Sequence, residues 1–385
     1  MALSKINANS ITDDSITVDQ IADTAVHGRR NLLINGAMQI SQRGTSSTTS
    51  GLRTVDRFFN TFGTVAVTQT QDTTVPSNEG FSRSYKNECT SASSATGAFF
   101  GISYHAEAQD IRNSGWDYTS SSSKITLSFY ARSSVAGTYM ASLRTDDGTQ
   151  YNIASQYTLA ADTWERVELT FPGNSNLTIN DDSGIGLKVF PMLELGSDYT
   201  SGSSFDTWTA HSGSTQSPDA NILFHDTANA TFFITGVQLE VGDKATPFEH
   251  RSFGEELSLC HRYTFAMQGT GDPLGSKGGA AIPGGGRGFW GFGSAHNSAN
   301  PVTWAQMPTS MRGVPSLTVS DNTHFDFDRG HSTLKSSTST IIQTLRSSSK
   351  AVAVICNVGS GLSNGEAGSL SANNSAAYMI FDAEL

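Results

Sequence analysis

Short strand-like runs recur along this 385-residue chain, and they limit the folds open to it more than any other feature. The runs are rich in β-branched and aromatic residues and are bounded by Gly, Pro, Asp or Ser. Examples are KITLSFYAR (124–132), TYMASLRT (138–145), RVELTFPG (166–173) and TFFITGVQLEV (231–241). Because no helical pattern separates these runs, they indicate antiparallel sheets and not a doubly wound fold. We therefore expect an all-β protein with a jelly-roll sandwich as the body domain over residues 29–252.

The pattern changes at RSFGEELSLCHRYTF (251–265). Ser252 and Glu255 have the spacing of a capping box, and Phe253, Leu257 and Cys260 share one face of a helix. A glycine-rich stretch (269–294) follows, and then strand-like runs such as KAVAVICNV (350–358). Residues 253–385 are thus predicted to form one short helix and a second, distal β-sandwich module.

The first segment has an apolar residue at every fifth position, at Ile6, Ile11, Ile16 and Ile21. This period fits neither a helix nor a flat strand, and one apolar residue in five buries too little surface to offset chain entropy. Our hypothesis is that residues 1–28 form an attachment leader, ordered by self-association or by docking on a larger particle. The alternative is a disordered tail.

Composition excludes several kinds of partner. The formal net charge is −11 and Lys and Arg do not cluster, so we expect no nucleic-acid partner. No apolar run approaches the ~20 residues needed to span a bilayer, and no signal-peptide pattern opens the chain. Cys89, Cys260 and Cys356 are far apart, which indicates buried thiols and neither a disulfide framework nor a Cys-x-x-Cys metal site.

Motifs for chemistry are weak. GSKGG (275–279) fails the Walker pattern, GTGDPLG (269–275) misses the dinucleotide-binding spacing, and HExxH is absent. In THFDFDRGH (323–331), Asp326 and Asp328 would share one strand face near His324, and such a pair could act as acid and base on a glycan. A solvated strand face is the commoner meaning of that pattern. We expect no enzyme activity and no cofactor.

Two oxygen-rich turns, TDDG (145–148) and NDDSG (180–184), have the ligand types that calcium prefers. Ordinary turn chemistry explains both, so we predict no metal site, with a structural calcium ion as the alternative.

Aromatic residues of the distal module are the candidates for ligand contact. Exposed rings stack on the C–H faces of sugars. Phe289, Trp290, Phe292 and Trp304 lie among glycines and are the predicted surface or glycan-binding residues; the alternative is an ordinary core or subunit interface.

Several blocks of the sequence carry a resemblance. They are NLLINGAMQISQRG (31–44), TVDRFF (54–59), ITGVQLEVGDKATPFEHRSFGEELSLCHRY (234–263), MPTSMRGVPSLTV (307–319) and the terminal DAEL. Together they resemble a family of bacteriophage tail-fibre proteins. The resemblance implies a leader that joins the fibre to the virion, a jelly-roll body similar to carbohydrate-binding modules, a distal module that meets the host surface, and a trimeric state.

We therefore expect a homotrimeric tail fibre that mediates attachment to the host bacterial surface, located in the virion and assembled in the host cytoplasm. Its expected partners are its own copies, phage tail or adaptor proteins through the leader, and a host surface polysaccharide or other receptor. Three linked weak sites would raise avidity without new contacts. The alternatives are a virion decoration or structural spike protein without a receptor, and a glycan-degrading tailspike.

Overall fold

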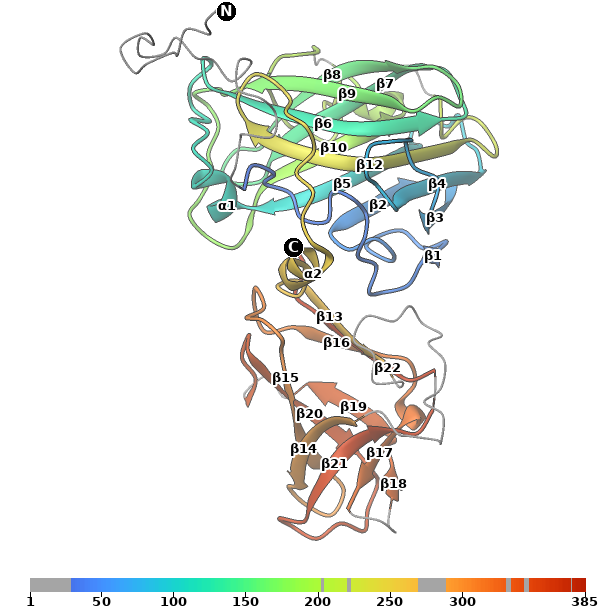
Figure 1. Ribbon diagram of the computed structural model, residues 1–385, viewed down its shortest axis with the longest axis vertical. Coiled ribbons are helices and arrows are strands. Elements are labelled where there is room, and N and C mark those ends of the chain that lie inside the picture. The colour runs from blue at the N-terminus through green and yellow to red at the C-terminus, as the bar shows by residue number, and fades with distance from the viewer. Residues whose placement is uncertain are drawn as a thin grey trace, which may run out of the picture.

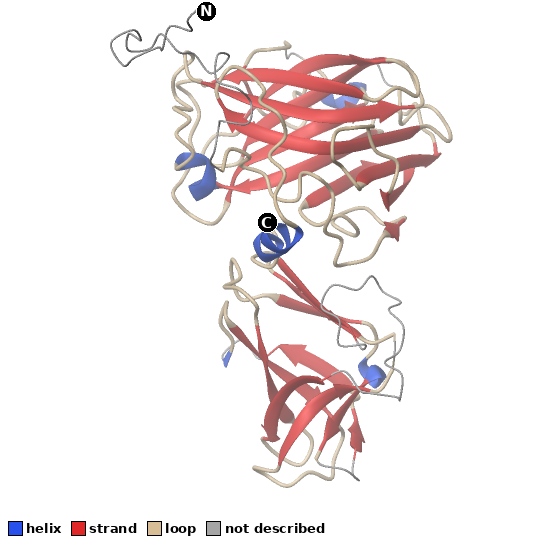
Figure 2. Cartoon of the chain, in the orientation of Figure 1, coloured by secondary structure: helices blue, strands red, loops and turns tan. Residues whose placement is uncertain are grey.

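Two β-sandwich modules lie along the long axis of the molecule, with a short helix between them (Figure 1). The computed structural model describes residues 29–201, 204–219, 223–268, 289–329, 334–342, 346–374 and 376–385. Strands dominate both modules (Figure 2). The predicted all-β class, with a sandwich, a helix and a second sandwich in that order, is confirmed. The proposed leader, with Ile6, Ile11, Ile16 and Ile21, lies outside the described residues.

The first sandwich consists of two six-stranded antiparallel sheets. The back sheet contains, in spatial order, β1 (Ser46–Ser47), β3 (Ala66–Asp72), β4 (Ser84–Ser91), β12 (Thr231–Val241), β6 (Lys124–Ser133) and β9 (Glu165–Pro172). The groove sheet contains β11 (Thr209–Ala210), β8 (Tyr151–Leu159), β7 (Gly137–Thr145), β10 (Ile185–Leu195), β5 (Phe99–Glu107) and β2 (Phe58–Gly63). The chain passes repeatedly from one sheet to the other, as in a jelly roll.

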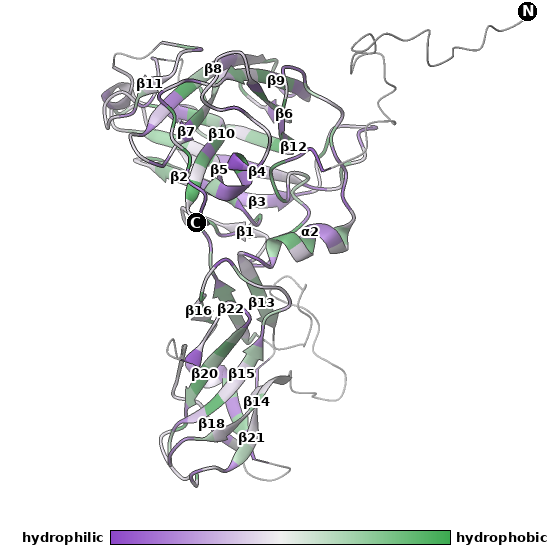
Figure 3. Ribbon diagram, turned by 90° about the vertical axis from the view of Figure 1, so that its left-hand side faces the viewer, coloured by the Kyte–Doolittle hydropathy of each residue, from purple (hydrophilic) through white to green (hydrophobic). Residues whose placement is uncertain are grey.

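Alternation along each strand fixes which side chains enter the core. In β7, Tyr139, Ala141 and Leu143 belong to the core between the two sheets, so Met140 and Arg144 project from the outer face of the groove sheet. Figure 3 shows hydrophobic and hydrophilic segments interleaved along the strands of both modules. The outer face of the groove sheet is therefore set by the same sequence pattern that builds the core.

Helix α2 (Phe253–Cys260) begins as the sequence predicts, because the Ser252 hydroxyl accepts a hydrogen bond from the Glu255 amide at 3.3 Å. The face that Phe253, Leu257 and Cys260 share is buried only in part. Phe253 is 48% exposed, and the buried residues are Glu256 and Cys260. Burial of Glu256 is tolerated because its carboxylate accepts the Asn35 amide, which satisfies a polar group inside the junction.

Among the described residues the structure adds a five-residue helix, α1 (Ala108–Arg112), after β5, and the 3-10 turns η4 (Ser197–Tyr199) and η5 (Asn322–His324). No helix in the described part of the chain is long and apolar enough to cross a membrane. Cys89, Cys260 and Cys356 are free and buried, as predicted.

The second sandwich pairs a three-stranded and a seven-stranded antiparallel sheet. The smaller sheet contains β13 (Thr264–Gln268), β22 (Tyr378–Asp382) and β16 (Ser316–Val319). The larger contains β18 (Leu334–Ser336), β17 (Phe325–Asp328), β21 (Ala367–Ala372), β14 (Phe289–Ala295), β15 (Pro301–Gln306), β20 (Ala351–Asn357) and β19 (Ser339–Ile342). Phe325, Val352 and Phe381 are among the residues of its separate core.

The junction between the modules shares residues of both. Cys260 and Tyr263 belong to the core of the first sandwich, although they follow residue 252, where the sequence placed the body's end. The terminal DAEL segment lies at this junction, where Asp382 ends β22 and Glu384 pairs with Arg57 of the first sandwich. There Arg312 donates to the backbone oxygens of Ala383 and Glu384 at 2.8 and 2.9 Å.

Candidate functional site: a groove on the outer face of the first sandwich

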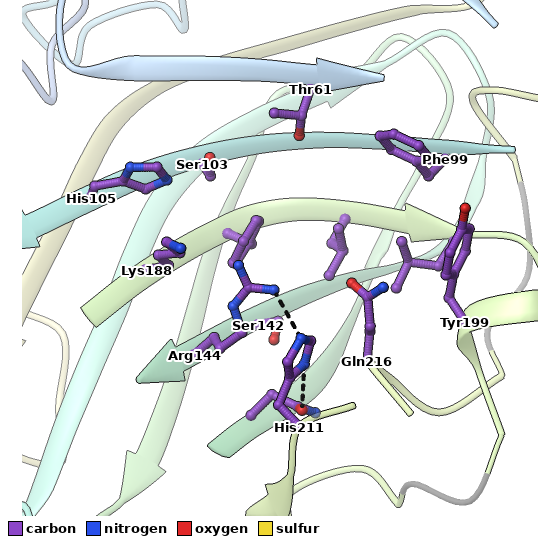
Figure 4. A pocket seen from close by; sticks show the side chains of 14 residues that line it. Thr61, Phe99, Ser103, His105, Ser142, Arg144, Lys188, Tyr199, His211 and Gln216 are labelled. Carbon is purple, nitrogen blue, oxygen red and sulfur yellow. Dashed lines mark hydrogen bonds between the residues drawn. The ribbon is translucent and has the colours of Figure 1, made fainter. Parts of the chain in front are cut away.

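A hollow of about 320 Å³ lies on the outer face of the groove sheet (Figure 4). We call it the groove. Its lining comes from five strands and the segments beside them, and consists of Thr61, Phe99, Ser103, His105, Ser142, Arg144, Asn152, Lys188, Phe190, Leu193, Leu195, Tyr199, His211 and Gln216.

The floor of the groove is apolar. Met140, Ala154, Leu193 and Leu195 form a buried cluster of their own, separate from the core between the sheets. Phe99, Phe190 and Tyr199 pack against this cluster and stay half-buried. An outer sheet face is ordinarily polar, so an apolar patch in a hollow indicates a binding surface.

Two aromatic rings stand at one end of the groove. The centroids of Phe99 and Tyr199 are 6.0 Å apart and their planes are nearly perpendicular, at 89°. The Tyr199 hydroxyl donates to the Gly97 carbonyl at 3.3 Å, which fixes the direction of that ring. Rings held this way can offer a face or an edge to the C–H surface of a sugar.

A row of polar side chains crosses the sheet beside these rings. Strand register places His105 opposite Lys188, Lys188 opposite Arg144, and Arg144 opposite Asn152. His211 extends the row: its Nε2 lies 3.4 Å from Arg144 Nη1 and its Nδ1 lies 3.3 Å from Asn152 Oδ1. Figure 4 shows this chain of contacts from the guanidinium through the imidazole to the amide. The row supplies both donors and acceptors to a ligand in the groove.

Only the guanidinium and the ammonium of this row carry charge at neutral pH. Burial, with a contribution from Lys188, lowers the pKa of His105 to about 3. Burial lowers the pKa of His211 as well, assisted by the charges of Arg144 and Lys188. The Lys188 ammonium is paired with Asp146, at 2.8 Å between Nζ and Oδ1. The groove thus presents positive charge and neutral hydrogen-bonding groups.

Sequence reasoning did not find this groove, because its residues come from segments between 61 and 216 that only strand pairing brings together. One local signal was present. In TYMASLRT both strand faces carry apolar residues near the start, Tyr139 inward and Met140 outward. Such a break in alternation predicts an outer face that is covered or bound.

Among the distal candidates, Phe292 and Trp304 are exposed, at 73% and 47%, on the neighbouring strands β14 and β15. Phe292 borders a shallow hollow with Asp328, Arg329 and Gly368 among its lining residues. Phe289 and Trp290 lie within β14, but their side chains are outside the described set. The role of these four residues stays a prediction.

The carboxylate pair of β17 is placed in two environments. Asp326 is 3% exposed and accepts a hydrogen bond from Asn373 Nδ2 at 2.9 Å. Asp328 borders the shallow hollow beside Phe292. His324 Nδ1 is 2.9 Å from the Ser320 hydroxyl. A buried carboxylate with an amide partner explains Asp326 as part of the fold.

The two oxygen-rich turns lie together. Asp147 accepts hydrogen bonds from the amide nitrogen and the side-chain nitrogen of Asn180, at 2.9 and 2.8 Å, and Asp182 accepts the Gly184 amide at 2.8 Å. Over the described ranges, no group of three or more His, Cys, Asp or Glu side chains could hold a metal ion. Turn hydrogen bonds occupy the carboxylates that were considered for calcium.

No protein-family model matches the chain, and no curated protein matches it. Among solved structures, it is similar to the enzymatically active domain of tailspike protein 4 of bacteriophage CBA120, with a TM-score of 0.31 and 13% identity over 55% of this chain and 21% of that one. It is also similar to the CBM22-1 xylan-binding domain from Paenibacillus barcinonensis, with a TM-score of 0.29 and 11% identity over 57% of this chain and 100% of that one. A third similar structure is the family 11 carbohydrate-binding module of Clostridium thermocellum, with a TM-score of 0.28 and 10% identity over 52% of this chain and 96% of that one. Likeness at this level carries no argument about what this chain binds.

Proposed function

We propose that this chain binds glycans through the groove of the first sandwich, as the host-recognition component of a phage tail fibre. One observation carries the proposal: an apolar floor with aromatic rings lies beside a row of hydrogen-bonding side chains on an outer sheet face. A sugar ring has an apolar C–H surface and a rim of hydroxyl groups, and it needs both kinds of contact at once.

The open shape of the site suits a polymer. The row runs from His105 on β5 to Asn152 on β8, across four adjacent strands of the sheet, so successive sugar units can contact different strands. Sugar hydroxyls both donate and accept hydrogen bonds, which suits a row of polar side chains. The groove therefore fits a chain of sugars that enters and leaves along the surface.

Assembly into a homotrimeric fibre, attached to phage tail or adaptor proteins through residues 1–28, belongs to the same proposal. The sequence blocks that resemble tail-fibre proteins support it. Three copies of a weak groove on one particle would raise the avidity for a repetitive surface. Light scattering on the purified full-length chain is expected to give three times 40.9 kDa; a monomer that stays monomeric with the leader intact would contradict the trimer.

A second contact surface on the distal module is favoured by the exposure of Phe292 and Trp304. Large apolar side chains left in water on neighbouring strands are commonly covered by a partner. We propose that they touch the host receptor once the groove has bound.

The proposal involves binding and no reaction. A decoration or structural spike protein would fail to bind host cells when added alone. A glycan-degrading tailspike would release reducing ends from host polysaccharide. Each rival therefore has its own readout in the same experiment.

The test measures binding of full-length protein to surface polysaccharides purified from candidate bacterial hosts, in parallel with a reducing-end assay. Phe99→Ala with Tyr199→Ala removes the aromatic end of the groove, and Phe292→Ala with Trp304→Ala removes the distal rings. Loss of binding in the first variant and little change in the second is the expected result. Binding that survives the groove variant and is lost in the distal variant would transfer the glycan site to the distal module.

A further inference from the structure

We propose that the ligand of the groove is an acidic glycan, and that Arg144 binds its carboxylate, phosphate or sulfate group. This inference rests on the proposed function and names the class of sugar polymer that the site takes.

Arg144 has no directly paired carboxylate in the described part of the chain, and the charge nearest to it in effect is Asp146, which pairs with Lys188. Its guanidinium contacts the neutral imidazole of His211, at 3.4 Å, and lies 5.6 Å from the centre of the Phe190 ring. In the part of the chain that the structure describes, no carboxylate lies within ion-pairing distance of Arg144, and its buried Nε has no hydrogen-bond partner. A partly desolvated guanidinium of this kind is stabilised when an anion arrives.

Several other arginines pair directly with carboxylates or donate to backbone oxygens, although Arg30, Arg43 and Arg57 also keep buried nitrogen atoms without a hydrogen-bond partner. Arg43, Arg57 and Arg262 each pair with a carboxylate, on Asp382, Glu384 and Glu107 respectively. Arg112 and Arg312, away from these pairs, donate to backbone carbonyl oxygens. Arg144 differs from Arg43, Arg57 and Arg262 in that no carboxylate pairs with it directly in the described residues.

The neighbours of Arg144 reinforce its charge. Lys188, the cross-strand neighbour on β10, is positive, and its partner Asp146 also accepts a hydrogen bond from Gln150 at 2.7 Å. Burial lowers the pKa of Arg144, and Asp146 acts in the opposite direction; an arginine side chain stays charged in proteins at neutral pH. The two ring nitrogens of His211 contact Arg144 and Asn152, so the imidazole orients the guanidinium at the edge of the groove.

The chain as a whole opposes such a ligand. Its formal net charge is −11, so an acidic polymer gains nothing from long-range attraction. At physiological salt the repulsion is screened beyond about 8 Å, whereas a half-buried contact is screened much less. Selection of an acidic glycan must therefore depend on the local guanidinium, with the apolar floor holding the sugar ring.

Arg144 has a geometry suited to this task. A planar guanidinium can bind a carboxylate or phosphate through two parallel N–H bonds, which gives direction as well as energy. The His211 imidazole, held by Asn152, lies against the guanidinium and fixes its position. Figure 4 shows Arg144 and His211 side by side at the groove.

The experiment titrates full-length protein with polygalacturonate, hyaluronan and poly(glycerol phosphate), and with the carboxyl-reduced neutral forms of the first two. At least one anionic polymer is expected to bind. Its affinity for the protein should exceed that of its neutral form about tenfold or more, and the Arg144→Met variant should bind the anionic polymer about tenfold or more weakly than the parent protein does. Arg132→Met is the matched control, because Arg132 lies on the back sheet and pairs with Asp162. Thermal denaturation verifies that each variant is folded.

The outcomes separate the two proposals. If neutral and anionic forms bind equally well and the Phe99→Ala, Tyr199→Ala variant loses both, the groove binds glycans and the acidic class is wrong. If Arg144→Met keeps the full preference for the anionic form, the role of Arg144 is wrong. Absence of binding to every polymer, charged or neutral, contradicts the acidic-glycan inference, and failure of the host polysaccharides as well contradicts the proposed function.

Discussion

The guanidinium of Arg57 pairs with the carboxylate of Glu384, which lies 327 residues further along the chain. Arg57 is fully buried, and its guanidinium carbon sits 3.4 Å from the centre of the Tyr263 ring. Glu384 also contacts Arg43, at 3.5 Å. Since Arg43 and Arg57 belong to the first sandwich and Glu384 follows the last strand of the second, these charges connect the two modules.

Glu384→Gln is expected to destabilise the protein strongly, because it leaves Arg57 as a buried charge without its partner. Removing one member of a buried pair typically costs roughly 3–5 kcal/mol. Urea unfolding measures the change in the free energy of unfolding. Glu255→Gln is the control, since Glu255 is exposed on α2 and its backbone amide, not its side chain, makes the cap contact. Equal stability of the two variants would contradict the role of the junction pair.

Gly254→Ala is expected to stabilise the protein. Gly254 is an exposed residue of α2, and a Cβ added there meets no atom within 4 Å. Alanine is favoured over glycine in a helix by roughly 0.5–1 kcal/mol.

Gly293→Ala has the opposite expected effect, because the new Cβ would lie 1.8 Å from the Val302 backbone oxygen on the paired strand. Differential scanning calorimetry distinguishes the two variants: the melting temperature rises for Gly254→Ala and falls for Gly293→Ala. A fall for Gly254→Ala would mean that α2 depends on the flexibility of this glycine.

Acidification is expected to destabilise the folded chain partly through His261. Burial lowers the pKa of His261 to about 4, against an ordinary value of 6.5. Between these values the unfolded state binds the proton and the folded state resists it, so the free energy of unfolding falls as the pH falls through this window. His261→Gln removes this contribution.

The measurement compares denaturant unfolding of the parent and the His261→Gln variant at pH 7 and pH 4.5. A smaller loss of stability in the variant is expected. His105, whose pKa is lowered to about 3, remains in both proteins and works in the same direction. If the free energy of unfolding fell equally in the parent and the variant, protonation of His261 would not destabilise the folded state.

The sequence predicted the features that depend on residues close together in the chain. The strand runs, the Ser252 cap and the buried thiols follow from residue types and spacing within a few positions. The burial of Glu256 on α2 could not be predicted locally, because the partner of this charged residue is the Asn35 amide, 221 residues away in sequence. The groove was missed for the same reason. Arg144 and Lys188 become neighbours only through the register in which β7 pairs with β10. A short stretch of sequence around either residue does not reveal that register.

Tyr199→Ala is expected to weaken glycan binding by the groove, whereas Tyr199→Phe is expected to retain it. The ring supplies a stacking surface next to Phe99, and aromatic contacts of this kind contribute about 0.5–1.5 kcal/mol, or roughly two- to tenfold in affinity. The hydroxyl only orients the ring, through the Gly97 carbonyl at 3.3 Å. Isothermal titration calorimetry with the best-binding polysaccharide measures both variants. If Tyr199→Phe were as weak as Tyr199→Ala, the hydroxyl itself would be the ligand contact, and the sugar would bind through that hydrogen bond in place of the ring face.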